Sequence, residues 1–416
     1  MRLRPYLTLL RGNPAFTRLF SAQLISFAGD WFATVALLGL ALELTGSPAI
    51  ASLLLVVQTG AFALASPIAG VLADRYDRRR LMVAADLARV PVALAFLLAR
   101  DPDSLWIAFV AAALLSLGAA VFEPTSSASL PNLVEEGELA EANVLIGSAW
   151  GTMLAVGAAL GGLVAATLGR DVAFAINAAS FAASAILIVG IRRSFRAVRG
   201  EPASGESRHR ERGGVVESMR VVLRFARGNR TLAALLLSKT TFGVGTGVIV
   251  LLAVFGRDVF NAGDAGIGIL FAARGLGALI GPFLVRSIVG VSERGLIAGI
   301  ATSFGIFAVS YGLLPVAPTL PLAAVAVFAG HLGGGAQWTI SSYGLQRAAP
   351  DAIRGRVFSF DYGLVTLTVT LSTLVAGFLA ERFSPAVTTW TIVGLAAVAA
   401  AGWIAFARPV WRRAGG

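Results

Sequence analysis

The stretch "GVLADRYDRRRLM", Gly70 to Met82, is a dense group of charges between two long apolar segments. Within seven residues it holds two aspartates and four arginines. The apolar segments on either side have about the 20 residues that a helix needs to cross a membrane. We therefore expect a short charged loop between two membrane spans. Three roles are open to it: chemistry, orientation of the chain, or a contact that holds one conformation.

The composition of the whole chain agrees with a membrane protein. Of its 416 residues 56% are hydrophobic and 14% are charged, whereas a soluble domain carries about 25% charged residues. The mean hydropathy is +0.79. Cysteine is absent, which excludes disulfides, thiolate nucleophiles and cysteine-based metal sites. The apolar residues extend over the whole chain, so we expect many spans and not a single anchor.

Twelve apolar runs have the length of a membrane helix, and turn or charge signals such as "TGSP" (45–48) separate them. We therefore predict an all-α integral membrane protein with twelve transmembrane helices in two six-helix bundles. The predicted spans are 18–43, 49–73, 81–99, 105–124, 143–168, 172–191, 232–255, 266–285, 295–314, 320–345, 357–380 and 387–406.

The distribution of basic residues predicts the orientation. With both termini in the cytoplasm, 27 of the 34 basic residues fall on the cytoplasmic side, four in outer loops and three inside spans. Such an imbalance is typical of the positive-inside rule. It accounts for the net charge of +11 without a nucleic-acid partner, and it favours contact with anionic lipids of the inner leaflet.

The chain divides into two halves around a polar segment. We expect an N-terminal bundle at 1–191, a cytoplasmic linker with an amphipathic helix at 192–231, and a C-terminal bundle at 232–416. "SSASL" (126–130) after span four parallels "SSYGL" (341–345) after span ten. Two related halves predict a transporter in which one half rocks against the other.

"GVLADRYDRR" resembles the signature of the loop between spans two and three in the major facilitator superfamily. The chain as a whole resembles the macrolide-efflux and enterobactin-exporter branch, through "FAGDWF", "ELTGSP", "SLPNLVEEGELAEAN" and "IRGRVFS". The resemblance implies the two-bundle fold, a monomer, the bacterial inner (cytoplasmic) membrane as location, and alternating access as mechanism.

The resemblance also implies a conformational gate and a glycine motif. In the gate, Asp74 would lie at the N-terminal end of span eleven, and the loop arginines would pair with acids. The gate residues are Gly70, Asp74, Arg75, Arg78, Arg79, Glu123 and Asp361. The span-five motif is "GAALGG", with Gly157, Gly161 and Gly162. Three positions depart from the family pattern: Asp77 and Ala158 replace the usual glycine and proline, and Leu114 replaces the arginine of span four.

Ionisable residues inside spans need an explanation, because each costs about 3 kcal/mol at a helix centre. Asp30 is the leading candidate for a proton or substrate site, since it lies roughly 18 Å into span one with Gln23 on the same face. Its alternative role is a structural hydrogen bond. Asp86 and Arg89, three residues apart, are expected to form a structural pair. Glu123 is expected to pair with a loop arginine.

The remaining candidates lie at mid-span depth. Each could contact a substrate, and each could instead pack, snorkel or join two helices. They are Gln58, Asn177, Lys239, Arg274, His331, Gln337 and Trp338.

These observations predict a secondary active exporter of small amphipathic molecules of the drug, macrolide or siderophore type, driven by proton antiport. The alternative is an importer, or a lipid or metabolite transporter, of the same fold. A membrane enzyme is disfavoured, because the chain has no H-E-x-x-H motif and no G-x-S-x-G after a strand. We expect no metal and no cofactor, with the proton as coupling ion.

Overall fold

The computed structural model describes residues 4–193, 195, 215–288, 293–349 and 351–413. All regular elements among these residues are helical. Twelve helices have the length and the apolar composition to cross a membrane. The predicted all-α architecture with twelve spans is thereby confirmed.

The helices follow the apolar runs, with ends set by local signals. Asn13 and Ser47 cap α2 and α3, and each is followed by a proline at the first helical position. The α-helices are α1 (Arg4–Gly12), α2 (Pro14–Thr45), α3 (Pro48–Arg75), α4 (Arg78–Leu94), α5 (Leu105–Leu133), α6 (Leu139–Thr167), α7 (Arg170–Val189), α9 (Val215–Gly228), α10 (Arg230–Gly245), α11 (Val248–Val254), α12 (Gly263–Ile288), α13 (Glu293–Leu313), α14 (Leu320–Ala348), α15 (Asp351–Arg382) and α16 (Pro385–Arg413).

The seventh span differs from the continuous helix expected at 232–255. It breaks after Gly245 into α10 and α11, and a π-helical turn, η4 (Phe255–Val259), ends it. The break falls in "GVGTGV", where glycines lower helix propensity. Ser372 of α15 repairs the backbone: its hydroxyl accepts from the Gly247 N–H (2.9 Å) and donates to the Val244 carbonyl (2.5 Å). A broken membrane helix needs such partners.

The chain forms two compact units. Unit 1 contains Met1–Arg199 and Leu252–Gly275, and unit 2 contains Gly200–Leu251 and Leu276–Gly416. The boundary at residue 251 lies just past the break in the seventh span.

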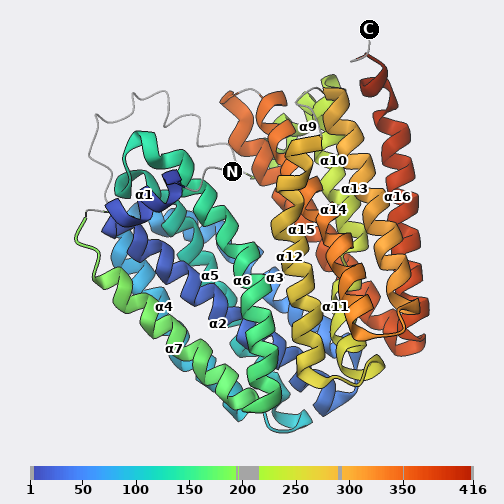
Figure 1. The fold of residues 1–416 in the computed structure, drawn as a ribbon. Helices are drawn as coiled ribbons and strands as arrows, with labels where there is room; N and C mark the ends of the chain where they lie inside the picture. The colour runs from blue at the N-terminus through green and yellow to red at the C-terminus, as the bar shows by residue number, and fades with distance from the viewer. Residues whose placement is uncertain (1–3, 194, 196–214, 289–292, 350, 414–416) are drawn as a thin grey trace. The chain divides into compact units, whose positions relative to one another are not determined.

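Unit 1 is built around α2, which packs against both α6 and α7. Helix α4 packs against α5 and α7, and α3 packs against α5 (Figure 1). Its apolar clusters include Phe16, Leu19 and Phe181, all fully buried. Unit 1 therefore brings residues of α2, α4, α5 and α7 together in its interior.

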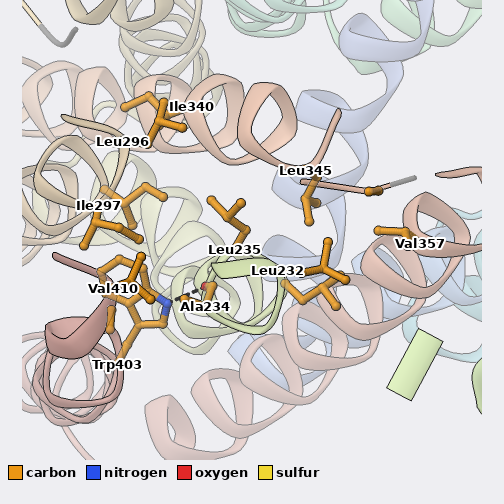
Figure 2. Packing of buried hydrophobic residues seen from close by; sticks show 14 of the residues in the cluster. Leu232, Ala234, Leu235, Leu296, Ile297, Ile340, Leu345, Val357, Trp403 and Val410 are labelled. Atoms are coloured by element: carbon orange, nitrogen blue, oxygen red, sulfur yellow. Dashed lines mark hydrogen bonds between the residues drawn. The ribbon is translucent and has the colours of Figure 1, made fainter. Parts of the chain in front are cut away.

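Unit 2 is built around α10, which packs against α14, α15 and α16. Figure 2 shows Leu232 and Leu235 of α10 in an apolar cluster with Trp403 of α16. The Trp403 indole N–H donates to the Ala234 carbonyl (2.7 Å). The predicted amphipathic segment is a helix, α9, whose Val222 is buried against this cluster while Arg220 and Arg224 are exposed.

Candidate functional site

The interior of unit 1 holds a buried ion pair on α4. Arg89 donates to Asp86 Oδ1, and the Ser184 hydroxyl of α7 donates to Asp86 Oδ2 at 2.6 Å. Arg89 is 3% exposed and Asp86 is fully buried. Both carboxylate oxygens of Asp86 thus have a partner.

The neighbouring helices leave room for the Arg89 side chain. Its guanidinium carbon lies 4.2 Å from the centre of the Phe181 ring and 5.2 Å from that of Phe122. A Cβ atom at Gly118 would lie 2.7 Å from the Arg89 side chain. The missing side chain at Gly118 therefore makes room for the Arg89 side chain between α4 and α5.

Two further carboxylates accompany this pair. Asp30 on α2 is partly buried and has Arg89 and Asp86 as its electrostatic neighbours. Glu123 on α5 is partly buried and interacts electrostatically with Asp30 and Arg89. The cluster, Asp30, Asp86, Arg89 and Glu123, contains three carboxylates and one guanidinium. We call it the acidic cluster.

Buried amides of α2 and α7 lie in the same bundle. Asn177 is fully buried, and neither of its side-chain polar atoms has a hydrogen-bond partner. Gln23 is buried, and its Oε1 has no partner. Gly29 permits the close approach of α7, since a Cβ there would lie 2.1 Å from the Ser180 hydroxyl. Buried polar atoms without partners are able to bind water or a ligand.

Unit 2 holds a second buried ion pair, between different helices. Lys239 Nζ of α10 lies 2.5 Å from Asp361 Oδ2 of α15, and both side chains are at most 1% exposed. Asp361 Oδ1 has no partner. Gln337 of α14 is also fully buried. Its side-chain nitrogen donates to the hydroxyl of Ser238 on α10 (3.2 Å), while its Oε1 has no partner.

Aromatic rings cover Lys239. Its Nζ lies 4.6 Å from the centre of the Trp338 ring and 6.0 Å from those of Phe358 and Tyr362. The Trp338 and Tyr362 rings meet edge to face at 5.8 Å. We call Lys239, Asp361, Trp338, Phe358 and Tyr362 the lysine box.

The other predicted polar residues lie apart from these two groups. His331 of α14 is buried, and its Nδ1 lies 2.7 Å from the Tyr311 hydroxyl of α13. Arg274 of α12 is partly buried, with its guanidinium 5.9 Å from the ring centre of Trp150. Gln58 is partly buried on α3. The His331 contact joins α13 and α14. Joining two helices is the structural alternative that the sequence analysis gave for this residue.

Two residues of the loop signature contact nearby backbone groups. The Asp77 side chain accepts from the Arg80 backbone N–H and caps α4, which explains an aspartate where the family has glycine. Arg79 donates to the Val189 carbonyl at the end of α7, and Arg78 is partly buried.

The acids assigned to the gate also have other neighbours. Glu123 interacts with Asp30 and Arg89 in the interior of unit 1, and Asp361 binds Lys239 in the interior of unit 2. The backbones of Gly70, Asp74 and Arg75 belong to α3, and their side chains lie outside the described part of the chain. Their gate function remains a prediction.

The span-five glycines lie at close helix contacts. A Cβ at Gly157 would lie 3.1 Å from Trp31 Cβ, and one at Gly161 would lie 2.7 Å from Phe32 Cα, both on α2. A Cβ at Gly162 would lie 2.7 Å from Gly268 Cα on α12. These glycines pack α6 against two helices at once.

A cluster at the predicted outer ends of the spans was missed. The Arg170 guanidinium binds Asp264 through two nitrogens (2.7 and 3.2 Å) and Glu43 at 2.8 Å. Arg257 lies 3.5 Å from Glu43 and donates to the Gly39 carbonyl. The sequence analysis counted Arg170 and Arg257 only as basic residues of the outer loops. The acids Glu43 and Asp264 at nearby span ends were the signal that could have predicted these ion pairs.

Among the described residues no group of three or more histidine, cysteine or acidic side chains could hold a metal ion.

Comparison with known proteins identifies the family. A model of the family described as transmembrane secretion effector matches residues 8–413. The chain belongs to this family. The transporter is therefore a multi-pass membrane protein of the major facilitator superfamily and not an enzyme, as its sequence predicted.

Relatives and structural neighbours agree. Over 394 residues the transporter is 29% identical to the multidrug efflux pump Tap of Mycolicibacterium fortuitum, covering 90% of this chain and 91% of Tap. It is 26% identical to the enterobactin exporter EntS of Shigella boydii serotype 4, covering 84% and 82%. A shorter match, 30% identical, covers 44% of this chain and 44% of the MFS-type transporter YfiS of Bacillus subtilis.

Among solved structures, a bacterial homologue of the human lysosomal transporter Spinster superposes with a TM-score of 0.72 at 16% identity. The match covers 95% of this chain and 96% of that one. At this identity the likeness shows the fold alone.

Proposed function

We propose that the transporter exports small amphipathic molecules by proton antiport, with alternating access between its two units. The observation that carries the proposal is the acidic cluster of unit 1. With all groups ionised, its three carboxylates and one guanidinium would carry a charge of −2 inside a membrane span, where uncompensated charge is expensive. One bound proton would halve that excess, to −1.

Asp30 is the group that we assign to the proton. Asp86 is held on both oxygens by Arg89 and Ser184, so it is committed to structure. Asp30 and Glu123 interact with Arg89 from outside that ion pair, so a proton can bind there without breaking the pair. Asp30 lies near the middle of its span, whereas Glu123 lies close to the end of its own. Protonation of Asp30 from outside would release substrate, and deprotonation inside would favour loading.

The direction of transport rests on the relatives. Tap and EntS are named as an efflux pump and an exporter, and each aligns over more than four-fifths of this chain. Drug-type sites are mostly apolar with a few polar anchors, and the buried Gln23 and Asn177 supply unpaired polar atoms near Asp30. The described activities of Tap and EntS, together with the unpaired polar atoms, favour export of amphipathic compounds.

The test uses purified transporter in liposomes with an imposed pH gradient and a panel of a macrolide, a catecholate siderophore and a lipophilic cationic dye. We expect at least one to move against its gradient, and Asp30→Asn to abolish that movement. Substrate exchange without a pH gradient should continue in the variant, because exchange needs no net proton movement.

The matched control is Asp103→Asn, which removes an exposed carboxylate at the predicted outer surface. It should transport like the unmodified protein. Full pH-driven transport by Asp30→Asn would disprove the assignment of the proton to this residue. Accumulation in the opposite direction would favour an importer.

The same proposal includes a bacterial inner membrane location and a monomeric state. The arginines predicted on the cytoplasmic side favour anionic lipids there, and this accounts for the +11 charge without nucleic acid.

A further inference from the structure

Helix α9, which precedes the seventh span, is attached to unit 2 through one of its faces. Val222 is fully buried in the apolar cluster around α10, and Phe225 and Ala226 pack against that cluster from partly buried positions. The helix contacts α10 and α15. This face accounts for the attachment of α9 to the protein, and it leaves the other sides of the helix to be explained.

A second apolar strip on α9 faces away from the protein. Met219 is 43% exposed and Leu223 is 42% exposed. Residues four apart in a helix are neighbours on its surface, so these two side chains form one strip. Each successive residue turns by about 100°, which places the strip next to the buried face that contains Val222. Attachment of α9 to unit 2 does not require this strip.

Three arginines form the next strip around the helix. Arg220, Arg224 and Arg227 are exposed, and they follow one another at spacings of four and three residues, which place them on one side. The sequence of α9 holds one acidic residue, Glu217, so basic charge is in excess. The order around α9 is therefore a buried apolar face, an exposed apolar strip and a basic strip.

The connection to the seventh span places α9 at the surface of the membrane. Gly228 ends α9 and Arg230 begins the span, so Asn229 alone separates the two helices. The Asn229 side chain accepts from the Leu232 N–H and caps α10. A helix at this level of a membrane buries its exposed apolar residues among acyl chains and keeps its basic residues among the lipid headgroups.

We propose that α9 binds an anionic phospholipid of the cytoplasmic leaflet, with the phosphate on Arg224 and Arg227 and the acyl chain along Met219 and Leu223. A guanidinium donates two parallel N–H groups to a phosphate, which a lysine does not. A phospholipid carries a phosphate and an acyl chain side by side, as the two adjoining strips require. A soluble phosphate would use the basic strip alone.

This inference rests on the proposed inner-membrane location and deepens it, since it names the surface that the anionic lipids contact. Its test needs neither a substrate nor a pH gradient. Failure of the proton assignment to Asp30 and failure of this lipid contact are therefore separate outcomes.

The test uses the absence of cysteine from the chain, which makes an introduced cysteine a unique labelling site. Met219→Cys carries a thiol-linked fluorophore in the full-length transporter, in nanodiscs of phosphatidylcholine. Nitroxide-labelled phosphatidylglycerol and nitroxide-labelled phosphatidylcholine with the same acyl chains are compared as quenchers. We expect half-maximal quenching at a mole fraction about threefold lower for phosphatidylglycerol, because basic residues near a membrane attract its charge.

Three double variants in this background separate the basic strip from the charge of the whole protein. Arg224→Gln/Arg227→Gln should abolish the preference for phosphatidylglycerol. Arg224→Lys/Arg227→Lys should keep part of it, since lysine retains the charge and loses the bidentate geometry. The matched control, Arg4→Gln/Arg11→Gln, removes the same charge from exposed positions of α1 and should leave the preference unchanged.

The positions are exposed, so we expect each variant to fold, and unfolding midpoints without phosphatidylglycerol check this. Equal quenching by the two lipids in the Met219→Cys protein would overturn the proposal. So would an equal loss of preference in the two glutamine variants, because general attraction would then explain it. Quenching by neither lipid would show that protein, from this chain or a second copy, covers the strip. Loss of the preference on addition of inorganic phosphate would identify a site for a soluble anion instead.

Discussion

The two membrane-buried ion pairs of this transporter differ in how completely they are satisfied. Asp86 and Arg89 lie three residues apart on one helix, and a serine and two phenylalanines complete their surroundings. Lys239 and Asp361 lie on different helices, 122 residues apart in the sequence, and Asp361 keeps one oxygen without a partner. The carboxylate of the first pair is closed and that of the second is open, while Arg89 Nε in the first pair also has no hydrogen-bond partner.

The difference teaches which buried charge to assign to structure and which to function. A closed carboxylate has no oxygen left for a ligand, so the Asp86–Arg89 pair contributes by holding α4, α5 and α7 together. An open pair retains unused hydrogen-bonding capacity at a membrane depth where that capacity is costly. Burial alone does not distinguish the two, because both pairs are inaccessible.

The largest effect is expected from breaking the closed pair. Arg89→Gln leaves Asp86 as an uncompensated buried charge, which costs about 3–5 kcal/mol. Thermal unfolding of the purified protein in detergent should show a large fall in the midpoint. Lys239→Gln should also lower the midpoint, because it leaves Asp361 as an uncompensated buried charge. An unchanged midpoint for either variant would contradict the assignment of its buried ion pair.

A second test fills the space that the closed pair needs. Gly118→Ala places a Cβ 2.7 Å from the Arg89 side chain, and such overpacking costs about 1–3 kcal/mol. Gly147→Ala is the matched control, since its Cβ would meet no atom within 4 Å. The unfolding midpoint should fall for the first variant and stay or rise for the second. If both behave alike, Arg89 is not confined as described.

The third test extends the comparison to the predicted outer ends of the spans. Arg170 is partly buried and holds two acids, so Arg170→Gln should cost about 1–2 kcal/mol, between a buried and a surface pair. Arg100→Gln breaks a pair whose members are 59% and 53% exposed and should cost less than about 1 kcal/mol. Unfolding midpoints at low and high salt would check the order.

The smallest effect on stability is expected from removing the exposed carboxylate of Asp101. Hydrogen bonds from Ser104, first from its backbone N–H, hold the pKa of Asp101 below its ordinary value of 3.8. The stabilisation is therefore present above that ordinary value and is lost as the pH falls through the lower pKa of the folded state. Asp101→Ala should lower the unfolding midpoint slightly at pH 7, by less than Arg170→Gln. The difference should shrink below pH 3.8, and a constant difference would contradict this cap.

Contacts within one helix could be predicted, and contacts between helices could not. The Asp86–Arg89 pair follows from a spacing of three residues, which places both side chains on one face. From the sequence, Lys239 and Asp361 were assigned separate roles, a site and a gate, because no spacing rule connects residues on α10 and α15. The same holds for Arg170 and Asp264, which lie 94 residues apart. The break in the seventh span was signalled by its glycines and was missed because the apolar run is continuous.

By itself the sequence determined the number of spans, the expected orientation and the family. Hydrocarbon imposes helices of about 20 apolar residues, and charges must lie between them, so these properties are written along the chain. Only the tertiary structure decided which acid faces which base, and which of those pairs is complete. Those pairings depend on how helices pack around α2 and α10, and packing joins residues that the sequence keeps far apart.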